Sequence, residues 1–220
     1  MHIESIYLLI GLLPLIGYLM LLGLIRLSGR SLITTGGRDI ATLGLAIAGL
    51  VAVGPGELFF PKAAAGLFGA WVWLALAVFY GLIVCLVALV SRPRLVIYGR
   101  TPSQMIDPLL AAAQELDGQS TCDRERLEVT LPTLKVRLRI GGQPGLDSAT
   151  VESFAPISSS EFWDKLLGHL RVQSQTTTPP TPRRGAMMLA ASILLATFAL
   201  YRSMGDRQQI VEQFGQWLWR

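Results

Sequence analysis

The sequence predicts an integral membrane α-helical protein with about four transmembrane helices and an inserted small α/β two-layer sandwich domain. Three observations predict this class. Of the 220 residues, 51% are apolar and only 15% are charged, which is unusual for a soluble domain. The apolar residues form long uninterrupted runs, whereas the stretch between the third and fourth runs has the shorter periods of strands and amphipathic helices.

The third run is the clearest, because from Leu67 to Val90 its only ionisable side chains are Tyr80 and Cys85. It is longer than the roughly 20 residues that a helix needs to cross a bilayer. We therefore expect the following organisation: a membrane domain over 1–91 with helices at about 6–27, 40–60 and 66–90, an α/β domain over 92–175, a Pro/Thr linker over 176–184, a fourth transmembrane helix over 185–202 and an amphipathic tail over 203–220.

The first run predicts a retained helix, because it lacks the basic start and small-residue cleavage site of a secretory signal. Pro14 should kink this helix and leave one carbonyl without its helical partner. We expect a neighbouring helix or a local adjustment to accommodate that carbonyl.

The second run is broken by Gly54-Pro55-Gly56, and Glu57 follows the break. In one interpretation the helix surfaces here and Glu57 lies at headgroup level. In the other interpretation the broken segment stays inside the membrane, where Glu57 would bind an ion or a proton. The substitution Glu57→Gln separates the two, since only the second predicts the loss of an ion flux.

The basic residues predict the orientation of the chain through the positive-inside rule. Eight of them flank one set of loops and three flank the other. We therefore expect both termini outside, residues 92–184 in the cytoplasm, and a bacterial inner membrane as the location. In the tail, Trp217 and Trp219 are predicted interfacial anchors, with partner binding as the alternative.

The middle domain predicts the order β-α-β-β-β-α with a mainly antiparallel sheet. The expected strands are 95–98, 126–131, 134–140 and 149–154, and the expected helices begin with capping boxes at Thr101 and Ser158. If Pro132 and Thr133 form the turn of the central hairpin, then Leu131 faces Leu134, Val129 faces Val136 and Leu127 faces Leu138, while Glu128 faces Arg137 and Thr130 faces Lys135.

The polar face of this sheet is a candidate interaction face, which gathers Arg126, Lys135, Arg137 and Arg139. Such a face suits anionic headgroups or an acidic partner. It is also typical of the solvated side of an antiparallel sheet, where charges prevent aggregation. Because no aromatic residue alternates with the basic ones, we expect no binding of single-stranded nucleic acid.

No catalytic motif occurs in the sequence, and neither the two cysteines nor the two histidines are spaced as metal ligands. We therefore expect no cofactor, no metal and no enzymatic activity. The leading hypothesis is a binding, scaffold or regulatory component that acts through the cytoplasmic domain with a protein partner or as a homo-oligomer. The alternative is a small transporter or channel subunit that uses the broken second span.

Overall fold

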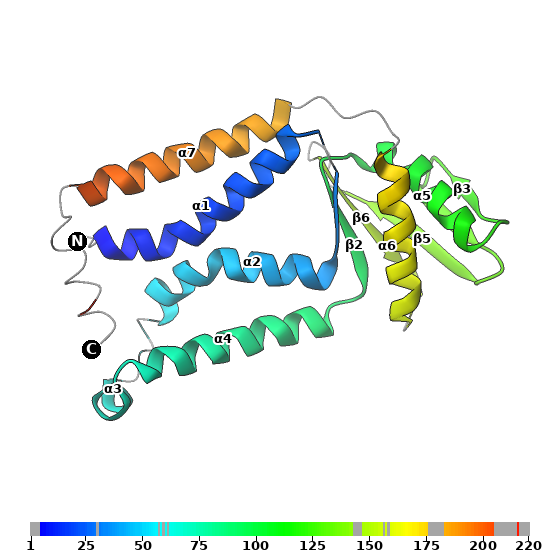
Figure 1. The fold of residues 1–220 in the computed structure, drawn as a ribbon. Helices are drawn as coiled ribbons and strands as arrows, with labels where there is room; N and C mark the ends of the chain where they lie inside the picture. Colours follow the sequence, from blue (N-terminus) through cyan, green and yellow to red (C-terminus); the bar gives the residue numbers. More distant parts are fainter. Residues whose placement is uncertain are drawn as a thin grey trace. The chain divides into compact units, whose positions relative to one another are not determined.

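A computed structural model describes residues 5–29, 31–56, 58, 60, 62–142, 147–155, 157, 159–175, 183–204 and 215. Within these residues the chain forms two compact units (Figure 1). One unit contains most of the long apolar helices. The other contains the sheet and its two covering helices, and it also takes in residues 23–39 from between the first two long helices.

Four helices are long and apolar enough to cross a membrane, as predicted. They are α1 (Ser5–Leu27), α2 (Gly36–Val51) with the π-helical turn η1 (Ala52–Gly56), α4 (Trp71–Val90) and α7 (Arg183–Met204). The expected continuous helix over 66–90 is wrong, because Gly69 separates α3 (Lys62–Phe68) from α4. Gly69 has φ 54° and donates its N–H to the Ala65 carbonyl, which is a common glycine ending for a helix.

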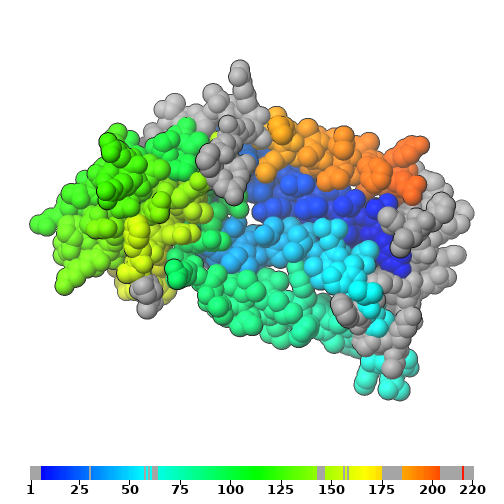
Figure 2. Space-filling model, turned by 180° about the vertical axis from the view of Figure 1, so that it is seen from behind, coloured from blue at the N-terminus to red at the C-terminus, as the bar shows by residue number. Residues whose placement is uncertain are grey.

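The long apolar helices approach one another at glycines. The carbonyl of Ile10, which Pro14 cannot bond because proline lacks an N–H, lies where a side chain on Gly49 of α2 would begin. On the other side of α2, Gly44 lies against Val84, and the Tyr80 hydroxyl donates to the Gly44 carbonyl at 2.7 Å. Figures 1 and 2 accordingly show α2 between α1 and α4. The Ile10 carbonyl therefore contacts a neighbouring helix, which is one of the two ways in which we expected it to be accommodated.

The sheet has six antiparallel strands in the order β1-β2-β6-β5-β4-β3, instead of the four that were expected. The strands are β1 (Leu32–Thr35), β2 (Arg94–Tyr98), β3 (Thr121–Asp123), β4 (Glu128–Leu131), β5 (Val136–Gly141) and β6 (Ser148–Ser153). The two additional strands, β1 and β3, are only four and three residues long and form the sheet edges. Strands this short have little periodicity of their own, so their pairing with β2 and β4 defines them.

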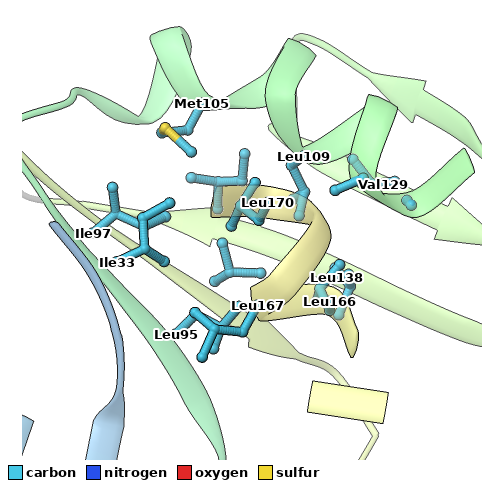
Figure 3. Close-up of a cluster of buried hydrophobic side chains, with 14 of the residues drawn as sticks. Ile33, Leu95, Ile97, Met105, Leu109, Val129, Leu138, Leu166, Leu167 and Leu170 are labelled. Atoms are coloured by element: carbon cyan, nitrogen blue, oxygen red, sulfur yellow. The ribbon is translucent and has the colours of Figure 1, made fainter. Parts of the chain in front are cut away.

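Two helices, α5 (Pro102–Leu116) and α6 (Ser160–Gln175), pack on one face of the sheet. Figure 3 shows their side chains meeting those of the strands in a single core. The Gln104 side-chain oxygen accepts the Thr101 N–H at 3.1 Å, so Gln104 closes the start of α5 as expected. For α6 the capping hydroxyl belongs to Ser159, which accepts the Phe162 N–H, and Ser158 lies outside the described residues.

The register of the central hairpin differs from the prediction by two residues. Leu131 faces Val136 and Val129 faces Leu138, so the turn is longer than Pro132-Thr133. Two features account for the longer turn. Lys135 adopts φ 53° and donates its N–H to the Pro132 carbonyl, and the Asp117 carboxylate accepts the N–H and the hydroxyl of Thr133. Because side chains alternate with a period of two, a shift of two keeps every residue on its expected face.

Candidate functional site

The face of the sheet opposite α5 and α6, which we call the open face, contains a hollow of about 790 Å³. We call it the open-face hollow. Its floor comes from β5, β6 and the start of β4. The ionisable side chains in its lining are three arginines and three glutamates: Arg92, Arg126, Arg139, Glu125, Glu128 and Glu152. The hollow is therefore charged without favouring either sign.

A row of alternating charges crosses the open face. The register places Glu128 of β4 beside Arg139 of β5, Arg139 beside Glu152 of β6, and Glu152 beside Arg94 of β2. We call these four residues the charged row. Arg94 and Glu152 form an ion pair at 3.7 Å, with side chains 37% and 55% exposed. Pairs this exposed contribute little to stability. The Arg94 end of the row also packs against the start of α2, where a Cβ added at Gly36 would lie 2.7 Å from the Cγ of Arg94.

The four residues of the predicted interaction face do not form one basic patch. Arg126 and Arg139 line the open-face hollow, and Arg126 also forms an ion pair with Asp123 at 3.8 Å. Arg137 lies next to the row, with its guanidinium 5.9 Å from the centre of the Phe154 ring. Lys135 instead lies in the β4–β5 turn.

Sequence reasoning missed Arg92, Arg94, Glu152 and Phe154 as parts of this surface. In the sequence, Arg92 and Arg94 follow the third apolar run and count among the basic residues that flank it, although Arg94 is the first residue of β2. Glu152 follows the alternation of its strand and could have been found from that pattern. Phe154, which is 53% exposed, comes just after β6 and lines the hollow. The same alternation places Phe154 on the face of Glu152, two residues before it.

A second polar cluster fastens β1 to the helical layer. The guanidinium of Arg171 on α6 donates twice to the Ile33 carbonyl, at 2.9 and 3.3 Å. Arg100 is 3% exposed and donates to the Ser174 carbonyl at 3.0 Å, in the last turn of α6. Burial lowers the pKa of Arg100, but a guanidinium stays charged at any physiological pH. These contacts stabilise a helix end and a sheet edge, so we assign the cluster a structural role.

A third cluster joins the end of α1 and the start of α2 to β2. The Tyr98 hydroxyl donates to the Asp39 carboxylate at 2.7 Å, and the Arg26 guanidinium lies 5.9 Å from the centre of the Tyr98 ring. Arg26 also packs against Gly185 of α7, where an added Cβ would lie 2.9 Å from the Cβ of Arg26. This cluster holds together segments that are far apart in the sequence, so we assign it a structural role.

Two of the predicted sites cannot be placed, because Glu57, Trp217 and Trp219 lie outside the described residues. Within the described part of the chain, no group of three or more His, Cys, Asp or Glu side chains could hold a metal ion. Cys85 and Cys122 are not joined by a disulfide.

Comparisons of the chain with protein-family models, curated proteins and solved structures found no match. The functional interpretation therefore rests on the geometry and the charges of the open-face hollow. Guanidinium and carboxylate groups in one hollow can form charge-assisted hydrogen bonds with groups of both signs.

Proposed function

We propose that this chain is a multi-pass membrane protein that acts by binding, as a scaffold or regulatory component, through the open face of its α/β domain. The observation that carries the proposal is the open-face hollow, a concave surface with both charge signs and one exposed aromatic ring. The opposite face of the sheet is filled by α5 and α6. On the open face, the β2 part is contacted by Asp39 and Arg26 through Tyr98, so the hollow over β4, β5 and β6 is the part that we propose a partner occupies.

The pairing of β1 with β2 supports a definite topology. These strands are neighbours in one sheet, so the segment between α1 and α2 lies on the same side of a membrane as the domain that follows α4. An even number of crossings must then separate β1 from β2. Between them lie α2 with η1, of 21 residues, and α4, of 20 residues, and either is long enough to cross. Because α4 is the longer uninterrupted apolar helix of a length to cross, we infer that it crosses and that the second span then crosses as well, without re-entering.

The basic residues indicate on which side of the membrane the α/β domain lies. Arg26, Arg38, Arg92 and Arg94 flank the loops on the domain side, and the positive-inside rule assigns that side to the cytoplasm. We therefore propose that residues 92–184 are cytoplasmic, that both termini are outside, and that the membrane is a bacterial inner membrane. The tail, with Trp217 and Trp219 as interfacial anchors, belongs to the same proposal.

Site-specific photo-crosslinking in intact membranes tests the binding role. A photoreactive amino acid replaces Phe154, which lines the hollow, and in a matched variant it replaces the exposed Gln114 of α5. We expect a crosslinked adduct at position 154, and none at 114. Its absence at 154 in a chain of normal abundance would contradict binding at this face.

A second candidate function, a small transporter or channel subunit, has one observation in its favour. The second span ends in the π-helical turn η1, which contains Pro55, and π-helical turns often occur at functional sites. Glu57 follows this turn in the sequence. Ion flux in proteoliposomes, with Glu57→Gln as the variant, tests this role. Flux that depends on Glu57 would favour it over the binding role.

A further inference from the structure

We propose that the open-face hollow holds the headgroup of a membrane phospholipid that carries both a phosphate and a primary ammonium, as phosphatidylethanolamine does. This inference rests on the proposed binding function and names its ligand class. Two observations support it. The first is the face of the sheet on which α1 ends and α2 begins, and the second is the arrangement of opposite charges in the hollow.

The start of α2 lies on the open face of the sheet, together with the end of α1. Residues 23–39 belong to the α/β unit. Within this unit the Asp39 carboxylate accepts the Tyr98 hydroxyl, and Gly36 packs against Arg94. Tyr98 and Arg94 alternate along β2 with residues of the core, so their side chains lie on the open face. Both helix ends are therefore on the side of the sheet that α5 and α6 leave uncovered.

The open face is consequently the face that is directed toward the bilayer. Both α1 and α2 are long and apolar enough to cross a membrane, and each leaves the α/β unit from this face. The hollow lies on the same face, over β4, β5 and β6, and β6 is the direct neighbour of β2. Strands are about 4.8 Å apart, so β5 lies only about 10 Å from β2. Headgroups next to the spans are therefore the ligands within closest reach.

The charges of the hollow suit a headgroup with both signs. Its three arginines and three glutamates cancel, so a simple anion has no net attraction to it. Arg139 lies between Glu128 and Glu152 in the register, which places a cation and an anion side by side on adjacent strands. Ethanolamine likewise holds its ammonium a short chain away from the phosphate. The guanidinium can donate to the phosphate while a carboxylate accepts from the ammonium, and both hydrogen bonds are charge-assisted.

Arg92 connects the hollow to the end of a span. It follows α4, which ends at Val90, and it lines the hollow together with Phe154. Arginine side chains close to the end of a span extend to the level of the headgroups. The Phe154 ring is 53% exposed, and an exposed apolar ring at this level packs against the boundary between headgroups and acyl chains.

Photo-crosslinking in bilayers of defined composition tests the proposal. The full-length chain, with a photoreactive phenylalanine derivative at position 154, is reconstituted in vesicles of equal parts phosphatidylethanolamine, phosphatidylcholine and phosphatidylglycerol. Mass spectrometry then identifies the crosslinked lipids. The ammonium of phosphatidylcholine is fully methylated and donates no hydrogen bond, and phosphatidylglycerol has no cation. We expect phosphatidylethanolamine adducts to exceed each of the others about tenfold, since hydrogen bonds to charged groups are the strong ones.

Substitutions in the hollow separate the contributions of the two charges. Glu152→Gln removes an acceptor for the ammonium, so the yield with phosphatidylethanolamine should fall to that with phosphatidylcholine. Arg139→Gln removes a donor to the phosphate and should lower the yield with all three lipids. Glu115→Gln, on the exposed surface of α5, is the matched control and should change nothing. The photoreactive group at Gln114 of α5, on the opposite face, should give no lipid adduct.

Protease resistance in the same vesicles shows that each variant folds, and Arg126→Gln, also in the hollow, replaces Arg139→Gln if that chain is not recovered folded. Equal yields with the three lipids, an unchanged preference in Glu152→Gln, or lipid adducts at position 114 would overturn the proposal. A crosslink from position 154 to a protein in intact membranes, with none to lipid in vesicles, would overturn this inference and leave the binding function standing. No adduct in either system would contradict both.

Discussion

Gly49 shows how one residue can decide the packing of two long apolar helices. Pro14 leaves the Ile10 carbonyl without a helical donor, and this oxygen lies where a side chain at position 49 would begin. The Cα–H of Gly49 that stands in place of a side chain therefore points at the oxygen, an arrangement that forms a weak hydrogen bond. Such close contacts between backbones are typical of helix packing in lipid.

We expect Gly49→Ala to lower the free energy of unfolding of the membrane unit by about 1–3 kcal/mol, because the added methyl group forces α1 and α2 apart. Thermal or detergent unfolding of the purified chain measures this. Gly81→Ala is the matched control, since a Cβ at Gly81 of α4 meets nothing within 4 Å. Equal stability of the two variants would contradict the packing described here.

Asp117 is the residue that holds the β4–β5 turn. Burial raises the pKa of its carboxyl, but hydrogen bonds from Gln119, Thr133 and Leu134 outweigh burial and lower the pKa below its usual value. The carboxylate accepts the Thr133 N–H at 2.8 Å and the Gln119 N–H at 3.1 Å. The turn is thus fastened to the end of α5 by an ionised group.

This lowered pKa predicts how stability depends on pH. The contribution of Asp117 is fully present above its unfolded pKa of about 3.9 and is lost as the pH falls through the lower folded pKa. We expect Asp117→Asn to lower the melting temperature at neutral pH, and the difference from wild type to shrink in acid below about pH 4. Asp164→Asn, on the exposed surface of α6, controls for the change in net charge. A difference that does not depend on pH would contradict the role of the ionised carboxylate.

At the scale of single elements, the β4–β5 hairpin shows how a turn sets the register. Lys135 occupies the left-handed region at φ 53°, which costs a residue with a Cβ roughly 1–2 kcal/mol. The Pro132 carbonyl and the Asp117 carboxylate hold the turn in place despite this cost. The hairpin therefore pairs Glu128 with Arg139, which is the pair that begins the charged row.

Glycine at position 135 should relieve this strain. We expect Lys135→Gly to raise the free energy of unfolding of the α/β domain by about 0.5–1 kcal/mol, because glycine adopts positive φ without strain. The greater conformational entropy of glycine in the unfolded chain offsets part of this stabilisation. Leu134→Gly is the control at a neighbouring exposed residue that lacks a positive φ, and it should lower stability. Denaturant unfolding of the two variants distinguishes them.

At the scale of the whole molecule, β1 brings a segment from between two of the long apolar helices into the sheet. It lies between α1 and α2 in the sequence, yet it pairs with β2, and its Ile33 is buried in the domain core. The segment between α1 and α2 is therefore part of the α/β domain.

The topology that follows can be measured by labelling single cysteines with a membrane-impermeant maleimide, after Cys85 and Cys122 have been replaced. We expect Ser28→Cys and Ser103→Cys, both at exposed positions, to be labelled from the same side. Arg202→Cys, at the far end of α7, should be labelled from the opposite side. Labelling of Ser28→Cys and Ser103→Cys from opposite sides would contradict the even number of crossings.

The sequence by itself determined the properties that depend on neighbouring residues. The length of an apolar run determines whether a helix can cross a bilayer, and the period of alternation determines which side chains of a strand share a face. These two rules predicted the four long helices and the faces of β4 and β5, including the outward direction of Arg137 and Arg139.

The tertiary structure alone decided which faces and strands meet. The chain carries no local signal that residues 32–35 pair with residues 95–98, or that Asp117 clamps a turn 16 residues away. Such contacts depend on long-range packing, and a strand can shift by two residues without moving any side chain to the other face. The sequence therefore predicts a basic interaction face. The observed register instead forms a row in which each arginine lies beside a glutamate.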